Sequence, residues 1–129
     1  MTELSDDTRA LFVAPNVGHV ATLLPDGAPH TVPMWVGLED GRIAFLTSPN
    51  SRKGRNLTRD PRVAISITDH ANPFVMAQVR GRAERIDGDA AWEIIDRIAR
   101  AYTGNPYALR EDRVIFLVDA EHVHVQSFG

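Results

Sequence analysis

The sequence predicts a mainly β domain (α+β), either a small closed barrel or a split β-barrel, with helices at its periphery. Apolar and polar residues alternate in about seven short segments, which is the periodicity of half-buried strands. Tight turns separate the early segments, and connections this short pair strands antiparallel. A barrel suits the pattern because closure removes exposed sheet edges. With 129 residues and no linkers, repeats or low-complexity segments, the chain is expected to form one domain over residues 1–129.

The first half of the chain contains a short helix followed by turn-linked strands. We expect the helix over residues 5–13, with Ser5 as its N-cap. The expected strands are residues 17–24, 30–37 and 42–47, the first two forming a hairpin around Pro25-Asp26-Gly27. Pro33 lies inside the second strand. Because proline cannot donate to a ladder, it marks a sheet edge, a bulge or a point where something else approaches.

The second half combines longer strands with one substantial helix. We expect strands over residues 62–68, 74–86, 113–118 and 122–128. The segment 74–86 is too long for an ordinary flat strand, and Gly81 at its middle suggests a bend in a barrel wall. The helix is expected over residues 90–102, with a buried stripe of Ile94, Ile95, Ile98 and Tyr102. Residues 103–112 are expected to form a polar loop.

One stretch concentrates positive charge. Residues 51–62 hold five of the 14 basic residues against one acid, in a chain of net charge -3, and Lys53 is the only lysine. Ser51 suits the N-cap of a short helix, and Gly54 in its first turn would let a ligand approach the backbone. Free N–H groups at a helix start together with several cationic side chains make an anion site, for which phosphate is the natural occupant. The alternative is a solvated basic face on a surface helix.

The composition excludes several classes of function. There are no cysteines, which rules out disulfides and thiolate chemistry, and the phosphate-binding glycine motifs are absent. Net acidity argues against a nucleic-acid binder. His122 and His124 share a strand face without a third ligand, so no metal site is predicted. An acidic N-terminus without an apolar leader, and no membrane-length apolar run, favour a cytoplasmic protein without a membrane partner.

The motifs around the basic stretch resemble those of a known superfamily. Pro25-Asp26-Gly27-Ala28-Pro29-His30, followed by Lys53-Gly54-Arg55-Asn56-Leu57 and Arg59-Asp60-Pro61-Arg62-Val63, is similar to the pyridoxamine 5'-phosphate oxidase-like split β-barrels, an FMN-binding fold. The Lys-x-Arg-Asn-Leu-x-x-Asp-Pro-Arg run most resembles the actinobacterial flavin/deazaflavin oxidoreductases, group B, many of which use coenzyme F420. The resemblance extends over essentially the whole chain.

The resemblance implies a homodimer with two cofactor sites at its interface. The basic stretch would grip the cofactor phosphate, one strand would line the ring, a strand end would approach ring and tail, and one residue would reach in from the partner subunit. The residues that match the phosphate grip are Arg52, Lys53, Arg55 and Asn56, and those that match the strand lining the ring are Pro33, Met34 and Trp35. Thr47, Ser48 and Ser51 match the strand end that approaches ring and tail. Gln78 matches the residue from the partner subunit.

The function implied by the resemblance is an F420-dependent oxidoreductase that transfers a hydride to an electron-poor C=C or C=N bond of a small organic substrate. An FMN-dependent oxidoreductase and a non-catalytic flavin or deazaflavin carrier or sensor are the alternatives. No catalytic residue is assigned, and solvent, His30 and Tyr102 all remain open as the proton partner. The long C-terminal segment that holds the vitamin in true pyridoxamine phosphate oxidases has no counterpart here, so that activity is not expected.

Overall fold

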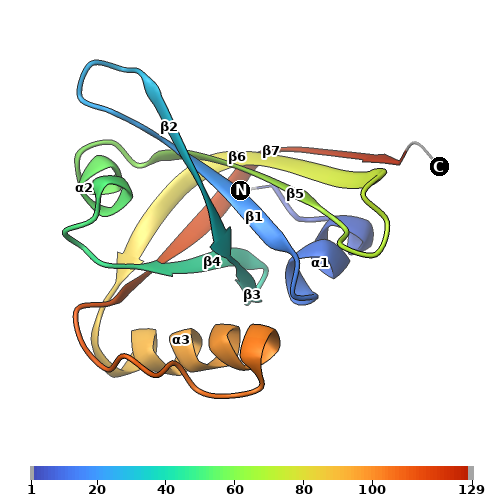
Figure 1. The fold of residues 1–129 in the computed structure, drawn as a ribbon. Helices are drawn as coiled ribbons and strands as arrows, with labels where there is room; N and C mark the ends of the chain where they lie inside the picture. The colour runs from blue at the N-terminus through green and yellow to red at the C-terminus, as the bar shows by residue number, and fades with distance from the viewer. Residues whose placement is uncertain (1, 128–129) are drawn as a thin grey trace.

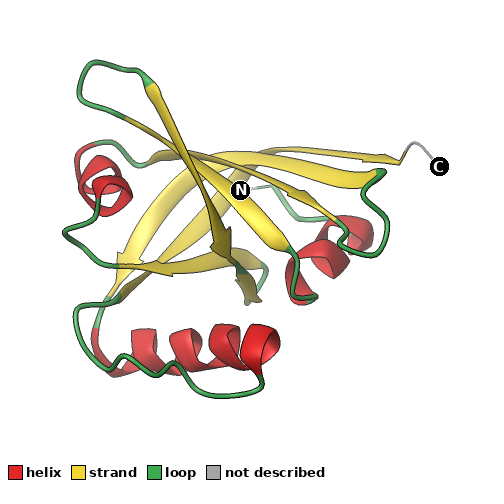
Figure 2. Cartoon of the chain, viewed as in Figure 1, coloured by secondary structure: helices red, strands yellow, loops and turns green. Residues whose placement is uncertain are grey.

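A computed structural model describes residues 2–127 as one strongly curled antiparallel sheet with three helices around it (Figures 1 and 2). The seven strands follow the order β2-β1-β5-β6-β7-β4-β3. The elements are α1 (Asp6–Val13), β1 (Val17–Leu23), β2 (Pro29–Trp35), β3 (Gly37–Glu39), β4 (Arg42–Thr47), α2 (Arg52–Arg59), β5 (Arg62–Thr68), β6 (Val75–Ile86), α3 (Gly88–Thr103) and β7 (Val114–Ser127). This architecture confirms the predicted split β-barrel.

The connection between β2 and β3 explains why the sheet curls. The expected strand over residues 30–37 is divided, because β2 ends at Trp35 and β3 begins at Gly37. These two strands are the opposite edges of the sheet, joined by Val36 alone. The Val36 amide donates to the Tyr102 hydroxyl at 3.0 Å instead of to a neighbouring strand. A sheet whose two edges are one residue apart must curl until they meet. Pro33 lies on the edge strand β2, as one of the readings of that proline predicted.

The last two expected strands, residues 113–118 and 122–128, are one strand. β7 runs beside β6 over its whole length, with a register shift between Arg80 and Gly81. Arg80 pairs with His122 and Gly81 with Ala120, so Glu121 is the extra residue of a β-bulge. The expected break between residues 118 and 122 is therefore a bend within one strand. The predicted bend at Gly81 is confirmed. The expectation for residue 128 lies outside the described residues.

Two apolar clusters lie on the two sides of the curled sheet. Phe12 of α1 packs with one face of the sheet, and Ile95 of α3 packs with the other. Between residues 114 and 118, alternate side chains of β7 belong to different clusters, so this part of the strand is buried on both faces. In Figure 1, α3 lies below the strands, α1 lies at the right beside the lower end of β1, and α2 lies at the left. Within the described chain, none of the helices combines the length and apolarity needed to cross a bilayer.

Gly81 is expected to be indispensable at the β6–β7 bend. A Cβ at this position would lie 2.0 Å from the Asp119 carbonyl oxygen. We expect Gly81→Ala to force the strands apart and to lower the free energy of unfolding by roughly 2 kcal/mol or more, measured by urea denaturation.

Gly27→Ala is the control for that substitution, because no atom lies within 4 Å of a Cβ there and the backbone φ is +87°. It should show only the conformational cost of about 1 kcal/mol. Equal losses in the two variants would contradict the steric account.

Candidate functional site

The strand-to-helix turn after β4 positions the basic stretch, and Ser51 fixes its shape. The Ser51 Oγ accepts a hydrogen bond from the Gly54 amide at 3.1 Å and donates to the Ser48 carbonyl at 2.7 Å. Thr47 Oγ1 lies 2.8 Å from the Ser51 Oγ. The predicted N-cap is confirmed. The first turn of α2 is therefore held directly against the end of β4.

Gly54 brings two parts of the backbone together rather than a ligand. A Cβ at residue 54 would lie 2.5 Å from the Ser48 carbonyl oxygen and 2.9 Å from that of Pro49. The expectation that Gly54 leaves room for a ligand beside the backbone is therefore wrong, because the chain's own turn fills that space. The glycine permits the close contact that keeps the basic residues beside β4.

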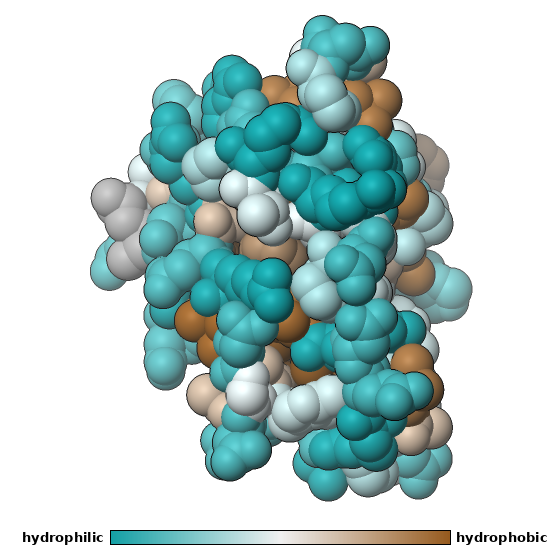
Figure 3. All heavy atoms as spheres, turned by 90° about the vertical axis from the view of Figure 1, so that its left-hand side faces the viewer, coloured by the Kyte–Doolittle hydropathy of each residue, from teal (hydrophilic) through white to brown (hydrophobic). Residues whose placement is uncertain are grey.

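Within residues 2–127, the cations at the start of α2 have no acidic partner. None of the ion pairs formed within residues 2–127 includes Arg52, Lys53 or Arg55. Lys53 is half-buried, and this burial lowers its pKa from the usual value, with the charge of Arg113 lowering the pKa further. Cations held together without a counter-charge, next to the positive end of a helix, attract anions. Figure 3 shows that the side of the molecule carrying α2 is mostly hydrophilic.

Asn56 lies inside the protein. Its side chain is fully buried and is joined to Thr22 Oγ1 across 3.0 Å. With its amide oxygen toward Thr22, the amide nitrogen also reaches the carbonyls of Leu23 and Arg52, each at 3.3 Å. These contacts tie α2 to β1 and to its own first turn. Asn56 therefore holds the basic helix in place, and its predicted contact with a cofactor stays a prediction.

The hydroxyl groups at the end of β4 also have internal partners. Thr47 is buried and bonded to Ser51, as described above. The Ser48 Oγ donates to the Asp112 carboxylate at 2.8 Å and accepts from the Asn50 amide at 3.2 Å. Ser48 thereby connects the basic turn to the loop that precedes β7. A role for either hydroxyl in binding a ring or tail stays a prediction.

An aromatic-walled hollow lies close to this turn. Pro33, Met34 and Trp35, which were predicted to line a ring, border a hollow of about 280 Å³ together with Leu46 and Tyr107. A second hollow of about 460 Å³ lies against Trp35 and the loop after α3. The Trp35 indole thus forms a wall of both.

Trp35 is held by two tyrosines. Its ring stacks on Tyr102 at 5.2 Å between centroids with a 10° interplanar angle, and meets Tyr107 edge-on at 6.4 Å. The Tyr102 hydroxyl accepts from the Val36 amide and donates to the Asn16 carbonyl. Burial raises the pKa of this hydroxyl. Tyr102 is therefore a bracing residue, occupied by backbone groups rather than poised to donate a proton.

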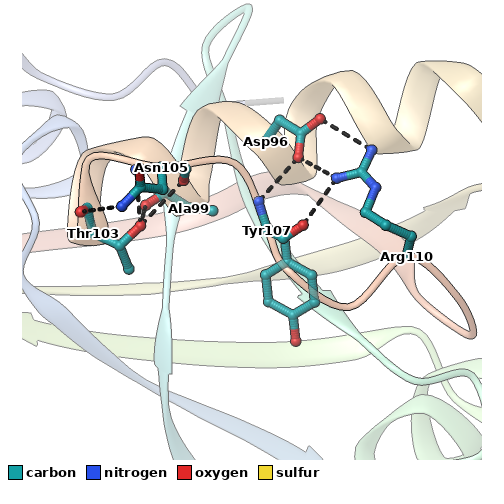
Figure 4. A network of polar contacts seen from close by, with 6 residues as sticks. All are labelled: Asp96, Ala99, Thr103, Asn105, Tyr107 and Arg110. Carbon is teal, nitrogen blue, oxygen red and sulfur yellow. Dashed lines mark hydrogen bonds and ion pairs between the residues drawn. The ribbon is translucent and has the colours of Figure 1, made fainter.

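The loop between α3 and β7 forms the other wall and is anchored to α3 by Asp96. The Asp96 carboxylate accepts from the Tyr107 amide at 3.1 Å and from the two terminal nitrogens of Arg110 at 2.6 and 3.2 Å (Figure 4). The Arg110 guanidinium also lies 4.5 Å from the centre of the Trp92 ring. The segment expected to be a polar loop is therefore a fixed part of the site.

Two residues of this region, Tyr107 and Arg113, were not anticipated from the sequence. The Arg113 Nε donates to the Tyr107 hydroxyl at 3.3 Å, and the guanidinium carbon lies 5.9 Å from the ring centre. A tyrosine within a polar loop was the available signal for the first. Arg113 gave no local signal, since its position depends on the pairing of β7 with the distant β4.

The sequence alone leaves two interpretations for His19 and His30, which lie on facing strands of the first hairpin: lining residues of one pocket, or hydrogen-bonded structural histidines. The structure contradicts the first. His19 lies opposite Pro33, and His30 lies opposite Thr22, so the two histidines point to different faces of the hairpin. His19 is exposed, whereas the Nδ1 of His30 is buried without a hydrogen-bond partner in the described chain.

Gln78 lies on β6, on the outward face of the sheet. Cross-strand pairing places Pro33, His19, Ser66 and Gln78 in one row over four adjacent strands. Three strand spacings amount to roughly 14 Å, so Gln78 does not reach the hollow beside Pro33 of its own chain. Its predicted contact with a cofactor therefore requires a second copy of the chain.

Comparison with known proteins gives a consistent family match. The family model described as "Pyridoxamine 5'-phosphate oxidase" matches residues 4–127. The pyridoxine/pyridoxamine 5'-phosphate oxidase of Chromobacterium violaceum is 30% identical over 109 residues, covering 83% of this chain and 47% of that protein. The enzyme of the same name from Kineococcus radiotolerans is 35% identical over 82 residues, covering 64% and 36%. The chain thus spans less than half the length of these curated relatives.

Solved structures match over more of their length. A protein described as an F420 reductase superimposes with a TM-score of 0.81 at 30% identity, covering 94% of this chain and 98% of the other. A conserved hypothetical protein from Mycobacterium tuberculosis gives a TM-score of 0.80 at 27% identity, covering 98% and 85%. A heme binding protein from Mycobacterium smegmatis gives 0.69 at 28% identity, covering 97% and 55%.

The Asp96 anchor predicts how the loop wall is held. In Asp96→Ala the Tyr107 amide and Arg110 lose their shared acceptor, so we expect amide hydrogen exchange in residues 105–112 to accelerate by about tenfold or more. Exchange in β6 and β7 should stay unchanged. Asp89→Ala, an exposed acid in the first turn of the same helix, is the control. Unaltered exchange at Tyr107 in Asp96→Ala would show that the loop is held by other contacts.

Proposed function

The chain belongs to the pyridoxamine 5'-phosphate oxidase family of flavin-binding oxidoreductases, and from this premise we propose that it is an oxidoreductase dependent on coenzyme F420. The substrate class is a small organic molecule with an electron-poor C=C or C=N bond. The observation that carries the proposal is the set of cations without acidic partners at Arg52, Lys53 and Arg55, next to an aromatic-walled hollow beside Trp35.

The residues fit a phosphate-bearing cofactor with a planar ring. Lys53 is half-buried with a lowered pKa, which is the state of a cation that gains from a bound anion. Trp35 and Met34 offer an apolar wall to a ring system. Two or three charge-assisted hydrogen bonds of roughly 1.5–3 kcal/mol each contribute about 3–9 kcal/mol before the costs of association. Micromolar affinity needs a net of only about -8 kcal/mol, so phosphate contacts and ring burial together suffice.

The chemistry divides between cofactor and protein. A reduced deazaflavin supplies the hydride when bound, and the protein supplies position and electrostatic field. Trp35 and Met34 keep water from one side of the ring, while Lys53 and its neighbours fix the tail. Solvent or His30 is the better candidate for the proton partner, because the Tyr102 hydroxyl is engaged by backbone groups.

Two kinds of relative support different cofactors. The F420 reductase matches this chain along nearly the full length of both, which supports the deazaflavin. The curated relatives are pyridoxine/pyridoxamine 5'-phosphate oxidases, which favours FMN as the alternative. Fluorescence titration of the purified protein with each cofactor distinguishes them. Tighter binding of FMN would overturn the assignment of F420.

A non-catalytic carrier or sensor is the remaining alternative. It shares the binding site but not the turnover. Reduced F420 should be oxidised in the presence of at least one member of a panel of enones, quinones and linear tetrapyrroles. Tight binding without oxidation across the whole panel would favour the carrier.

We also propose that the protein acts as a homodimer, paired through the outward face of β1, β2, β5, β6 and β7. Side chains on this face are exposed; they include His19, Thr31, Pro33, Ser66, Gln78, Arg80, His122 and His124. A hollow of about 340 Å³ on the same face has Ala21 and Ala64 on its floor. Short side chains at the centre of a sheet face leave room for a second sheet to pack. The face also carries Gln78, which reaches a cofactor site only from another copy.

Lys53→Ala tests the cofactor site. Removing the half-buried cation should weaken the binding of the preferred cofactor by about tenfold or more, since a charge-assisted hydrogen bond is worth at least 1.4 kcal/mol. Titration of intrinsic or cofactor fluorescence measures the effect, and circular dichroism should show an intact fold. Arg9→Ala removes one exposed cation on α1 and is the matched control. Equal affinity in Lys53→Ala and wild type would place the phosphate elsewhere.

Ala64→Arg tests the dimer. A long cation at the centre of the outward face should convert the dimer to a monomer, observed as a halved mass in analytical ultracentrifugation. Ala64 is partly exposed and points away from the core, so the fold should stay intact. Ala101→Arg introduces the same change on an exposed position of α3 and should remain dimeric. A dimeric Ala64→Arg protein would exclude this face as the interface.

A further inference from the structure

We propose that Arg113 is a second cationic anchor of the site and shares one phosphate group of the cofactor with Lys53. The proposal rests on the proposed function, because it assigns a residue to the same cofactor site. Arg113 follows the basic stretch of residues 51–62 by 51 positions, and no part of the family motif includes it.

Backbone geometry brings the two residues to one turn. Thr47, the last residue of β4, pairs with Val114, the first residue of β7, so Arg113 lies beside the point where the chain leaves β4. The Ser48 hydroxyl donates to Asp112, which fixes the two segments together. On the other side of the same turn, the first turn of α2 packs on Ser48 through Gly54. Lys53 and Arg113 therefore approach the turn from its two sides.

Neither residue has a carboxylate partner among the described residues. The polar contacts of Arg113 go to the Tyr107 hydroxyl and to the Asp112 carbonyl, at 3.3 and 2.8 Å. No ion pair in the described part of the chain includes Arg113 or Lys53. Arg110, three residues earlier in the same loop, does pair with Asp96. The loop thus contains one arginine satisfied by an acid and one left free beside a lysine.

The effect of Arg113 on Lys53 agrees with this proximity. After burial, the charge of Arg113 is the second cause that lowers the pKa of Lys53. Two cations that repel each other in the free protein are an unfavourable arrangement, which a shared anion relieves. Proteins retain unfavourable contacts of this kind, here two neighbouring cations, at sites where ligand binding requires them.

Tyr107 connects the anion site to the ring site. It lines the hollow beside Trp35, and its hydroxyl holds the guanidinium of Arg113. A ring in the hollow and a phosphate between Lys53 and Arg113 would therefore lie on opposite sides of one side chain. The planar guanidinium can bind two phosphate oxygens at once, whereas Lys53 acts as a point charge. Together they favour a phosphate-bearing ligand over the same ring system without phosphate.

The test compares phosphate-bearing ligands with counterparts that lack the phosphate; FMN and riboflavin differ in the phosphate alone, whereas F420 also carries a lactyl-glutamate tail. Wild type, Arg113→Gln, Arg113→Lys and Arg9→Gln are titrated with FMN and riboflavin, and with F420 and 8-hydroxy-5-deazariboflavin. We expect Arg113→Gln to weaken the preferred phosphate-bearing ligand by about tenfold, with its phosphate-free counterpart changed less than about twofold. Arg113→Lys should recover part of the loss, and Arg9→Gln should match wild type. The double variant with Lys53→Gln should lose less than the product of the single effects, because both side chains contact one group.

A pH series separates this role from a structural one. Protonated Lys53 is needed for binding, so the ratio of FMN to riboflavin affinity should fall as pH rises through the lowered pKa of Lys53. Removing Arg113 raises that pKa, and the fall should move to higher pH in Arg113→Gln. The ratio cancels ionisation of the ring, which both ligands share.

Three outcomes would overturn the inference. Equal losses for FMN and riboflavin in Arg113→Gln would mean that Arg113 acts only by holding Tyr107. An unchanged FMN affinity would place Arg113 outside the site, even if Lys53→Ala weakens binding. Wild-type protein that binds none of the four ligands would overturn the proposed function, and the inference with it.

Discussion

The hydrogen bond between the Val36 amide and the Tyr102 hydroxyl fixes the geometry on which the rest of the molecule depends. Val36 joins two strands that lie at opposite edges of the sheet, so its position determines how tightly the sheet curls. Tyr102 comes from α3 and also bonds the Asn16 carbonyl at the start of β1. One phenol thus ties the helix, the first hairpin and the edge crossing together. The same ring supports Trp35, so closure of the sheet and placement of the aromatic wall have one cause.

A second constraint gathers the charges. The turn capped by Ser51 holds α2 against β4, and the pairing of β4 with β7 brings the loop before β7 to the same place. The result is a group of cations that form no ion pair in the described part of the chain, and among them Arg113 repels Lys53. The stability of the free protein does not explain this arrangement. Acidic residues outnumber basic ones in the sequence and pair with other arginines, such as Arg97 and Arg110, so acids were available to pair with these cations. A bound anion does explain it, and proteins commonly give up some stability at sites that bind ligands.

Local patterns in the sequence were enough for most elements and for the basic half of the site. Ser51 as a helix cap, Gly81 as a bend and Pro33 at an edge each follow from the chemistry of one residue and its neighbours. The division of β2 from β3 was missed because it depends on Tyr102, 66 residues from Val36. Residues 113–118 and 122–128 were expected as two separate strands, because a bulge and a break look alike when the partner strand is unknown.

The binding residues show the same limit. Asn56 belongs to a motif typical of phosphate sites, but its side chain turns inward to Thr22, and a motif alone does not show which way a side chain points. Arg113 enters the region only through long-range pairing, so no local spacing could reveal it. Sequence reasoning found residues that are neighbours along the chain. It missed those that become neighbours through the register of β4 and β7.

The double burial of β7 between residues 114 and 118 has a consequence for cooperativity. Its alternate side chains belong to different apolar clusters, so unfolding of this segment would expose side chains of both clusters at once. We therefore expect the two clusters to unfold together, and this segment to open only on global unfolding. Arg113 comes directly before this segment, so its backbone is attached to a strand that both clusters bury, and this attachment exists before any ligand binds.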